Sequence, residues 1–303
     1  MTKTLLTYMN NSELSRLIAH FFSRPVLEDI ARRGSANLVG CELAALGVSS
    51  GNSQPRAADL FEAAFATLSR SYRCEYVYKA AIANRIVCGR HSPRTASLAM
   101  ELGVASSIAD VVVFNGTSTA YEIKTEYDSH RRLSTQTADY LRAFDKVYVV
   151  THPELATHYA NLTDERVGIL SLNGKNQFSE VRPATADISR LEATTVCRML
   201  RQNELMSAVQ QYFGPQPTLP NTHIRRYYSE LFCQLENARV HSALVSAFRK
   251  RTTTNEMADF ITKMPPSLRA LAFATPLSRP QRQRLLEALA TPLSKIKSPT
   301  VCL

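Results

Sequence analysis

The feature that most constrains the fold is a turn signal between two β-rich segments. Residues 108–114 and 120–125 are rich in β-branched and aromatic residues, and the Asn-Gly-Thr sequence at 115–117 is typical of a tight turn. Two such segments predict an antiparallel hairpin. If its loop is residues 115–117, positions 110 and 122 are equidistant from the middle of the turn, so Asp110 lies opposite Glu122.

The same hairpin gathers three charged side chains. Side chains alternate between the two faces of a strand, so Glu122 and Lys124 share a face, and residues directly opposite each other have Cβ atoms roughly 5 Å apart. Two carboxylates this close repel each other unless a cation lies nearby, and such pairs are therefore typical of functional sites. The alternative interpretation is an ordinary exposed ion pair between Glu122 and Lys124, with Asp110 facing solvent.

The rest of the chain indicates an α/β fold. Helical and β-rich patterns alternate from residue 133 to residue 172, which is typical of a layered structure. Helical patterns dominate before the hairpin, and beyond about residue 186 only helical segments follow. We therefore expect a helical N-terminal segment (1–71), an α/β domain (72–185) and an all-helical C-terminal domain (186–303). The helices of the last domain are expected near 187–200, 203–213, 222–250, 254–263 and 280–290.

Positive charge is concentrated in the C-terminal third. The net charge is +10, but residues 1–190 hold 21 Lys/Arg against 19 Asp/Glu, whereas residues 191–303 hold 15 against 7. Nucleic acid is the commonest anionic partner of a soluble basic protein, although acidic lipid or an acidic protein also fits. The candidates to grip a phosphate backbone are Arg225, Arg226, Arg249, Lys250 and Arg251. Solvated helix faces explain such charge runs as well.

Two further patterns bear on the class of protein. The six cysteines form no C-x-x-C pair and have no histidine at zinc-finger spacing, so free thiols are expected. The apolar stretch at the start of the chain is too short for a signal peptide, and no run of about 18 apolar residues, the length needed to span a membrane, occurs. We therefore expect a cytoplasmic protein with no membrane association.

The hairpin residues suit phosphodiester hydrolysis. That reaction needs a cation to neutralise the charge developing on phosphate, oxygen ligands for the cation, and a group that positions or deprotonates water. Two carboxylates and a lysine that converge on one point meet these needs.

The segment from Ala109-Asp110 to Glu122-Ile123-Lys124, followed by Gln136-x-x-x-Tyr140, resembles the PD-(D/E)XK nuclease superfamily. The nearest match within it is a bacterial family of little-characterised nuclease-like proteins, and RecB-type nucleases share the Gln-x-x-x-Tyr element. The resemblance covers about residues 72–172, and Ala109 stands where the superfamily name has proline. It implies a restriction-endonuclease-like core, which is a mixed central sheet flanked by helices.

The resemblance also implies roles for individual residues. Asp110 and Glu122 would bind Mg²⁺ or Mn²⁺ together with the backbone carbonyl of Ile123, and Lys124 would orient the attacking water or stabilise the pentavalent state. Glu75 matches an acidic residue that many members place beside the metal. The residues matched to substrate positioning are Gln136 and Tyr140, one helical turn apart.

Each of these assignments has a plainer alternative. Glu75 can pair with a neighbouring Arg or Lys on a helix face, and Gln136 and Tyr140 can serve packing or capping. Arg132 follows the second strand of the hairpin and can reach phosphate, but ordinary surface polarity also accounts for it.

Together these observations predict a Mg²⁺-dependent endonuclease that acts on DNA, whose basic helical domain holds the substrate or a protein partner. A second hypothesis keeps the fold but drops catalysis, leaving a nucleic-acid-binding module. A third is a protein-interaction component of a defence or mobile-element system, with the helical flanks binding another protein.

Overall fold

The computed structural model of the protein describes residues 11–51 and 54–292. The first residues, considered above for a signal peptide, and Cys302 lie outside the described residues. The chain divides into two compact units: the described residues up to Arg90 together with those from Glu256 onward, and His91–Asn255. These boundaries differ from the segment limits expected at 71/72 and 185/186, because the helices that follow residue 186 are shared between the two units.

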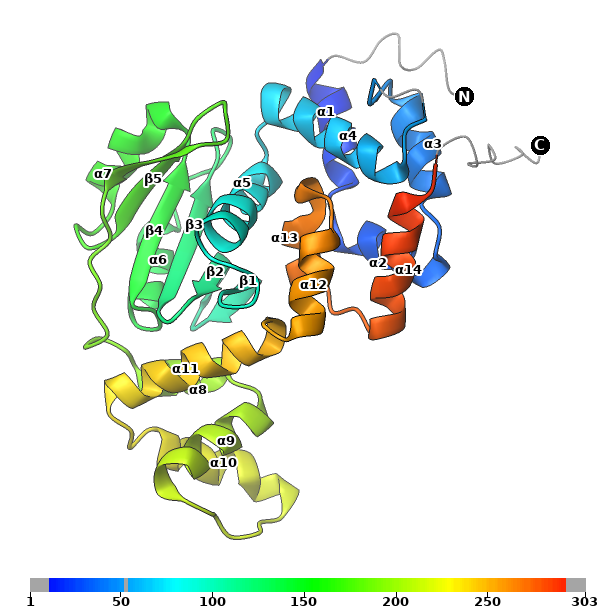
Figure 1. The fold of residues 1–303 in the computed structure, drawn as a ribbon. Helices are drawn as coiled ribbons and strands as arrows, with labels where there is room; N and C mark the ends of the chain where they lie inside the picture. The colour runs from blue at the N-terminus through cyan, green and yellow to red at the C-terminus, as the bar shows by residue number, and fades with distance from the viewer. Residues whose placement is uncertain (1–10, 52–53, 293–303) are drawn as a thin grey trace. The chain divides into compact units, whose positions relative to one another are not determined.

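The described residues of the first unit form helices and their connecting loops, with one isolated β-bridge between Arg56 and Pro292, and Figure 1 shows its N-terminal helices in blue and its C-terminal helices in orange and red. A stacked pair of aromatic rings, Phe22 and Tyr76, lies in its core with ring centroids 5.1 Å apart. Helix α2 ends at Gly34, whose φ of 66° is the left-handed conformation that glycine adopts without strain. Its helices are α1 (Asn11–His20), α2 (Arg24–Arg33), α3 (Asn37–Ala45), α4 (Ala57–Ser71), α5 (Glu75–Ala81), a π-helix (Ile82–Arg90), α12 (Asn255–Lys263), a 3₁₀ turn (Pro266–Leu268), α13 (Arg269–Ala274) and α14 (Arg279–Ala290).

The second unit contains a six-stranded mixed sheet and the helices packed on it, which confirms the α/β expectation. Its strands are β1 (Ser97–Val104), β2 (Ser107–Phe114), β3 (Ser118–Lys124), β4 (Lys146–Thr151), β5 (Gly168–Leu172) and β6 (Phe178–Arg182). Its helices are α6 (Leu133–Leu141), a 3₁₀ turn (Pro153–Leu155), α7 (Ala156–Leu162), α8 (Ala193–Met199), α9 (Gln202–Phe213), α10 (Asn221–Phe232) and α11 (Asn237–Thr252).

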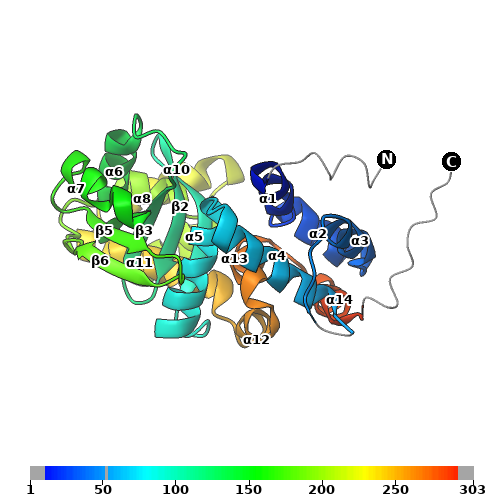
Figure 2. The same ribbon diagram turned by 90° about the horizontal axis from the view of Figure 1, so that it is seen from above.

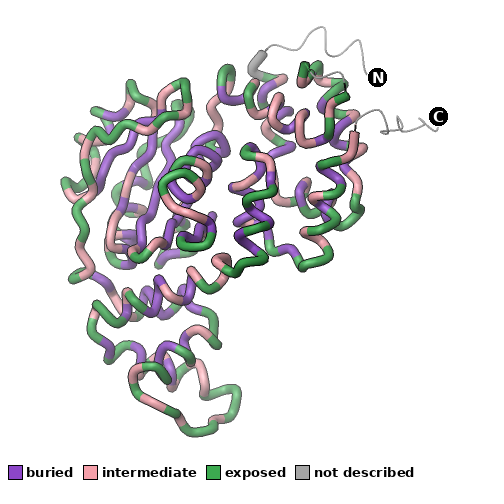
Figure 3. The backbone as a smooth tube through the Cα atoms, in the orientation of Figure 1, coloured by how far each residue is buried: buried purple, intermediate pink, exposed green. Residues whose placement is uncertain are grey.

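The order of the strands across the sheet follows their order along the chain. Strands β1, β2 and β3 form an antiparallel meander, β3 to β5 are parallel neighbours, and β6 returns antiparallel to β5. Helix α6 connects β3 to β4 and helix α7 connects β4 to β5, as parallel pairing requires. Strands β3 and β5 are buried along their whole length (Figure 3).

One face of the sheet carries the main apolar core of this unit. Helices α6 and α7 lie on the same side of the strands (Figure 2), and α8 and α11 pack against β1. The stacking of Phe114 on Phe248, with ring centroids 4.4 Å apart, joins β2 to α11. The buried residues of this core include Val112, Phe114, Ala120, Tyr140, Phe144, Val147, Val149, Val196, Leu244 and Phe248.

The expected hairpin is confirmed in detail. Strand β2 ends at Phe114, strand β3 begins at Ser118, and the intervening loop turns at Gly116 with a φ of 103°. Strand β4 spans the expected residues 146–151. Strands β1 and β6 were not expected, and the helix expected over residues 222–250 is broken into α10 and α11.

Candidate functional site

The hairpin register brings the two predicted carboxylates together. Val111 pairs with Tyr121 and Val112 with Ala120, so one further step along the ladder places Asp110 opposite Glu122. The Asp110 carboxylate also bridges the strands, because its Oδ2 accepts a hydrogen bond of 2.7 Å from the backbone N–H of Ile123.

Glu122 and Lys124 form a buried ion pair. The Glu122 residue is 1% exposed and Lys124 is 7% exposed, and the Lys124 Nζ lies 2.8 Å from Glu122 Oε1. The backbone of Lys124 is held as well, since its carbonyl accepts a hydrogen bond of 2.7 Å from Thr151 Oγ1 on the parallel strand β4. Burial of both groups rules out the alternative of an ordinary exposed ion pair on a solvated strand.

Helix α6 supplies the two other predicted residues of this site. Gln136 Oε1 accepts a hydrogen bond of 3.1 Å from Lys124 Nζ. The Tyr140 hydroxyl lies 2.8 Å from Glu122 Oε2 and 2.7 Å from the carbonyl oxygen of Ile108, so its single proton is shared between two acceptors. The structure thus joins four predicted residues of β3 and α6 into one hydrogen-bond network, and Asp110 of β2 lies opposite its central member, Glu122.

An aspartate anchors α6 against the sheet. The Asp139 Oδ2 accepts hydrogen bonds from the hydroxyls of Ser106 (2.8 Å) and Ser107 (2.7 Å), which lie at the turn between β1 and β2. Burial raises the pKa of Asp139, but the hydrogen bonds from these serines outweigh it and hold the pKa below its ordinary value. A charged Asp139 therefore fixes the helix that carries Gln136 and Tyr140.

The surroundings of Tyr140 keep its phenol neutral. Burial raises the pKa of Tyr140 most, and the negative charge of Glu122, its hydrogen bond to the hydroxyl and the charge of Asp110 raise it further. The hydroxyl therefore remains a hydrogen-bond donor to Glu122 across the physiological pH range.

The oxygen atoms at this site are those that a hard divalent cation prefers. They comprise the carboxylates of Asp110 and Glu122 and the backbone carbonyl of Ile123. Among residues 11–51 and 54–292 no group of three or more His, Cys, Asp or Glu side chains is placed to hold a metal ion. The two carboxylates and one carbonyl therefore suit Mg²⁺ or Mn²⁺, which retain several waters and take one or two carboxylates, rather than Zn²⁺.

Glu75 belongs to the first unit. It starts α5, and its Oε1 lies 2.5 Å from the Nζ of Lys79, one turn further along the same helix. Pairing with a basic neighbour, the plainer alternative for this residue, is therefore what the structure shows.

The structure also reveals an acidic residue beside Asp110 that sequence reasoning missed. Pairing of Met100 with Val111 and of Leu102 with Ala109 places Glu101 of β1 opposite Asp110. Glu101 is exposed and has a φ of 54°, a conformation that residues other than glycine seldom adopt. It was missed because no strand was expected over residues 97–104.

The predicted nucleic-acid-binding residues differ in how far they are available to a ligand. Two arginines bind internal partners: Arg225 donates to the carbonyls of Leu200 (2.9 Å) and Cys197 (2.7 Å), and the Arg251 guanidinium pairs with Glu204 at 2.6 Å. These two stabilise the packing of the helices. The exposed members are Arg132, Arg226 and Lys250, whereas Arg249 is half-buried.

Other features of the described residues match the sequence. The cysteines at 41, 74, 88, 197 and 233 are free thiols. None of the described helices has the length and apolar character needed to cross a membrane.

Comparison with known proteins identifies a family. The family described as bacteriophage P4 protein cII matches residues 69–269. A curated relative, protein cII of Enterobacteria phage P4, is 26% identical over 176 residues, which cover 56% of this chain and 64% of the relative. The chain thus spans less than two thirds of that relative, and no solved structure gives a significant match. Because the family match extends over most of its length, the chain belongs to the bacteriophage P4 protein cII family.

Proposed function

We propose that this protein is a metal-dependent nuclease that hydrolyses phosphodiester bonds of DNA, with Asp110, Glu122 and Lys124 at its centre. One observation carries the proposal: two carboxylates lie opposite each other on neighbouring strands, and a lysine on the same face reaches the second of them at 2.8 Å. A carboxylate pair of this kind is costly without a cation, which favours a functional over a structural origin.

The topology supports a restriction-endonuclease-like core. An antiparallel meander of three strands is followed by a helix and by a fourth strand parallel to the third. The first acidic residue lies on the middle strand of the meander, the second acid and the lysine lie on its last strand, and α6 carries the Gln-x-x-x-Tyr element. The succession of an acid on one strand, an acid and a lysine on the next, and the Gln-x-x-x-Tyr element on the following helix is the one that the resemblance to PD-(D/E)XK nucleases implies.

The proposed chemistry assigns each group a task. Asp110, Glu122 and the Ile123 carbonyl would hold Mg²⁺ or Mn²⁺, which would supply positive charge to the phosphate oxygens. The Lys124 ammonium donates to Glu122 and Gln136, and its third proton can serve a water molecule or a phosphate oxygen. Tyr140 holds the second oxygen of Glu122, so the carboxylate is fixed in one orientation.

Cleavage assays test this proposal directly. Plasmid, linear duplex, single-stranded DNA and RNA are incubated with the protein in EDTA, Mg²⁺ or Mn²⁺, beside the Asp110→Asn and Lys124→Met variants. Glu230→Gln, which alters an exposed acid paired with Arg226, is the matched control. We expect cleavage that needs the divalent ion and that falls at least about 100-fold in the two site variants but not in the control. Equal cleavage by all four proteins would identify a contaminant and refute the proposal.

A second candidate is a nucleic-acid-binding module without catalysis. The observation that favours it is the closed network around Glu122, in which Lys124 and Tyr140 satisfy both carboxylate oxygens. The fold would then persist without any metal. The relative is a phage protein, which fits the hypothesis of a mobile-element component. Retention of DNA in EDTA, together with no cleavage in either metal, would favour this candidate.

A further inference from the structure

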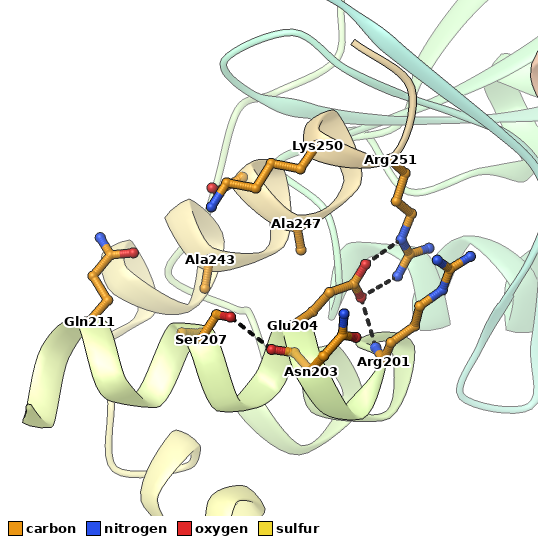
Figure 4. A pocket seen from close by; sticks show the side chains of 11 residues that line it. Arg201, Asn203, Glu204, Ser207, Gln211, Ala243, Ala247, Lys250 and Arg251 are labelled. Carbon is orange, nitrogen blue, oxygen red and sulfur yellow. Dashed lines mark hydrogen bonds and ion pairs between the residues drawn. The ribbon is translucent and has the colours of Figure 1, made fainter. Parts of the chain in front are cut away.

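A groove lies between α9 and α11 in the second unit, away from the residues assigned above to hydrolysis. Figure 4 shows its lining side chains, which come from one face of each helix. Its volume is about 290 Å³, enough for a phosphate group and part of its sugar. The groove is thus a defined hollow on the surface of the helical part of this unit.

The charges around the groove leave two cations in excess. Glu204 is the acid of the lining, and both of its oxygens bind Arg251, with Oε1 2.7 Å from Nε and Oε2 2.6 Å from Nη2. Arg251 and Glu204 therefore neutralise each other. Among the described residues neither the Arg201 guanidinium nor the Lys250 ammonium forms an ion pair, although the charge of Arg201 helps to lower the pKa of Glu204, and both residues are exposed.

The remaining lining residues argue against a protein partner. The apolar ones are Ala208, Ala243 and Ala247, and the neutral polar ones include Ser207 and Gln211. Protein interfaces depend on large anchors such as Trp, Tyr or Leu seated in pockets, and base stacking needs aromatic rings. A groove with cations, small residues and neutral hydrogen-bonding groups instead matches the contacts that proteins make to sugar and phosphate.

The net charge of the surrounding helices also favours an anionic ligand. Residues 191–255 hold eight Lys/Arg against four Asp/Glu. A local excess of this sign raises the concentration of a polyanion near the groove.

We propose that the groove between α9 and α11 binds the phosphate backbone of a nucleic acid, with Arg201 and Lys250 as its two charged contacts. The identity of the ligand rests on the proposed function, but binding here needs neither the metal nor the residues of the hairpin. The contacts reach only the backbone, so binding is independent of base sequence.

Binding experiments in EDTA separate this inference from cleavage. Fluorescence anisotropy measures the Kd of the full-length chain for labelled duplex and single-stranded oligonucleotides of two unrelated sequences, over a series of salt concentrations. The variants are Arg201→Gln, Lys250→Gln and the double variant. Arg190→Gln, which alters an exposed arginine that precedes α8 and is paired with Asp187, is the matched control. Thermal unfolding of each variant verifies that the fold is unchanged.

The expected result is weaker binding in the groove variants by the same factor for both sequences, on the order of tenfold for the double variant at low salt. The slope of log Kd against log salt should fall by about one for each residue removed. These changes should be absent in Arg190→Gln.

Three results would overturn the inference. One is an unchanged Kd and salt slope in the double variant, and another is an equal loss in the control. The third is binding of polyglutamate that is tighter than that of an oligonucleotide of the same net charge and depends on the same two residues, which would favour an acidic protein as the ligand. If the wild-type protein binds the oligonucleotides through the groove but cleaves none of the substrates in either metal, only the nuclease proposal is refuted.

Discussion

The Nζ of Lys124 lies 2.8 Å from Oε1 of Glu122, and both residues are almost completely shielded from solvent. Two buried charges are costly to bring out of water, and their attraction repays the cost only when good hydrogen bonds complete the arrangement. Here Gln136 and Tyr140 complete it. The pair is therefore one element of a polar network. Removal of either Glu122 or Lys124 leaves the charge of the other buried and unbalanced.

Lys124→Met should destabilise the protein strongly, because Glu122 would remain buried without its cation. We expect a loss of about 3 kcal/mol in the free energy of unfolding, measured by urea denaturation. The double variant Glu122→Gln/Lys124→Met should lose less than the sum of the two single variants. Additive losses would show that the two side chains are energetically independent.

Tyr140→Phe removes the hydroxyl that Glu122 and the Ile108 carbonyl share, and should cost about 1–3 kcal/mol at neutral pH. The variant should also flatten the alkaline loss of stability. Because the folded state raises the pKa of Tyr140 above its ordinary value of 10.0, only the unfolded state ionises just above that pH. Stability is therefore full below about pH 10 and falls as the pH rises. Chemical denaturation at a series of pH values measures both effects, and an unaltered alkaline slope in the variant would contradict the second.

His241→Gln should remove an acid-sensitive contact between α11 and the hairpin. The His241 Nε2 lies 3.0 Å from the buried Ser118 Oγ. Burial lowers the pKa of His241 below its ordinary value of 6.5, although the charge of Asp145 opposes this. The unfolded state therefore binds a proton first, so stability is full above about pH 6.5 and falls at lower pH. Thermal unfolding between about pH 5 and 7 should show a shallower decline for the glutamine variant, and an identical decline would assign the acid sensitivity to other groups.

Gly168→Ala should be poorly tolerated, because no space exists for a methyl group at this position of β5. An added Cβ would lie 2.3 Å from a ring carbon of Tyr148 and 2.6 Å from the backbone nitrogen of Ala184. We expect a loss of about 1–3 kcal/mol in the free energy of unfolding. Gly103→Ala on β1 is the matched control, since nothing lies within 4 Å of its added Cβ. Comparable stability of the two variants, measured by denaturant titration, would contradict the expectation.

The hairpin could be read from the sequence because its determinants are local. A turn at Gly116 and alternation along two short strands fix the register, and this register alone brings Asp110 opposite Glu122. The contacts of Gln136 and Tyr140 followed from their spacing on one helix and from the resemblance to a known pattern.

The elements that the sequence did not predict depend on contacts with residues distant in the chain. Strand β1 contains Leu, Ala, Met and Glu, which favour helices, and its extended form is imposed by pairing with β2. The break between α10 and α11 contains neither glycine nor proline, so no local signal marks it. It coincides with burial of Leu235 in the core of the unit. The grouping of the last helices with the first ones likewise depends on tertiary packing that periodicity does not encode.

The arrangement of the strands also has a consequence for how the second unit assembles. Every strand pairs with its neighbour along the chain, but the parallel pairs β3–β4 and β4–β5 must each wait for a helical crossover, whereas the antiparallel pairs need only short turns. The β1–β3 meander can form first from the short connections at 105–106 and 115–117. Asp110, Glu122 and Lys124 would then meet early, whereas the hydrogen bonds from Tyr140 to Glu122 and from Lys124 to Gln136 form only when α6 docks on the hairpin.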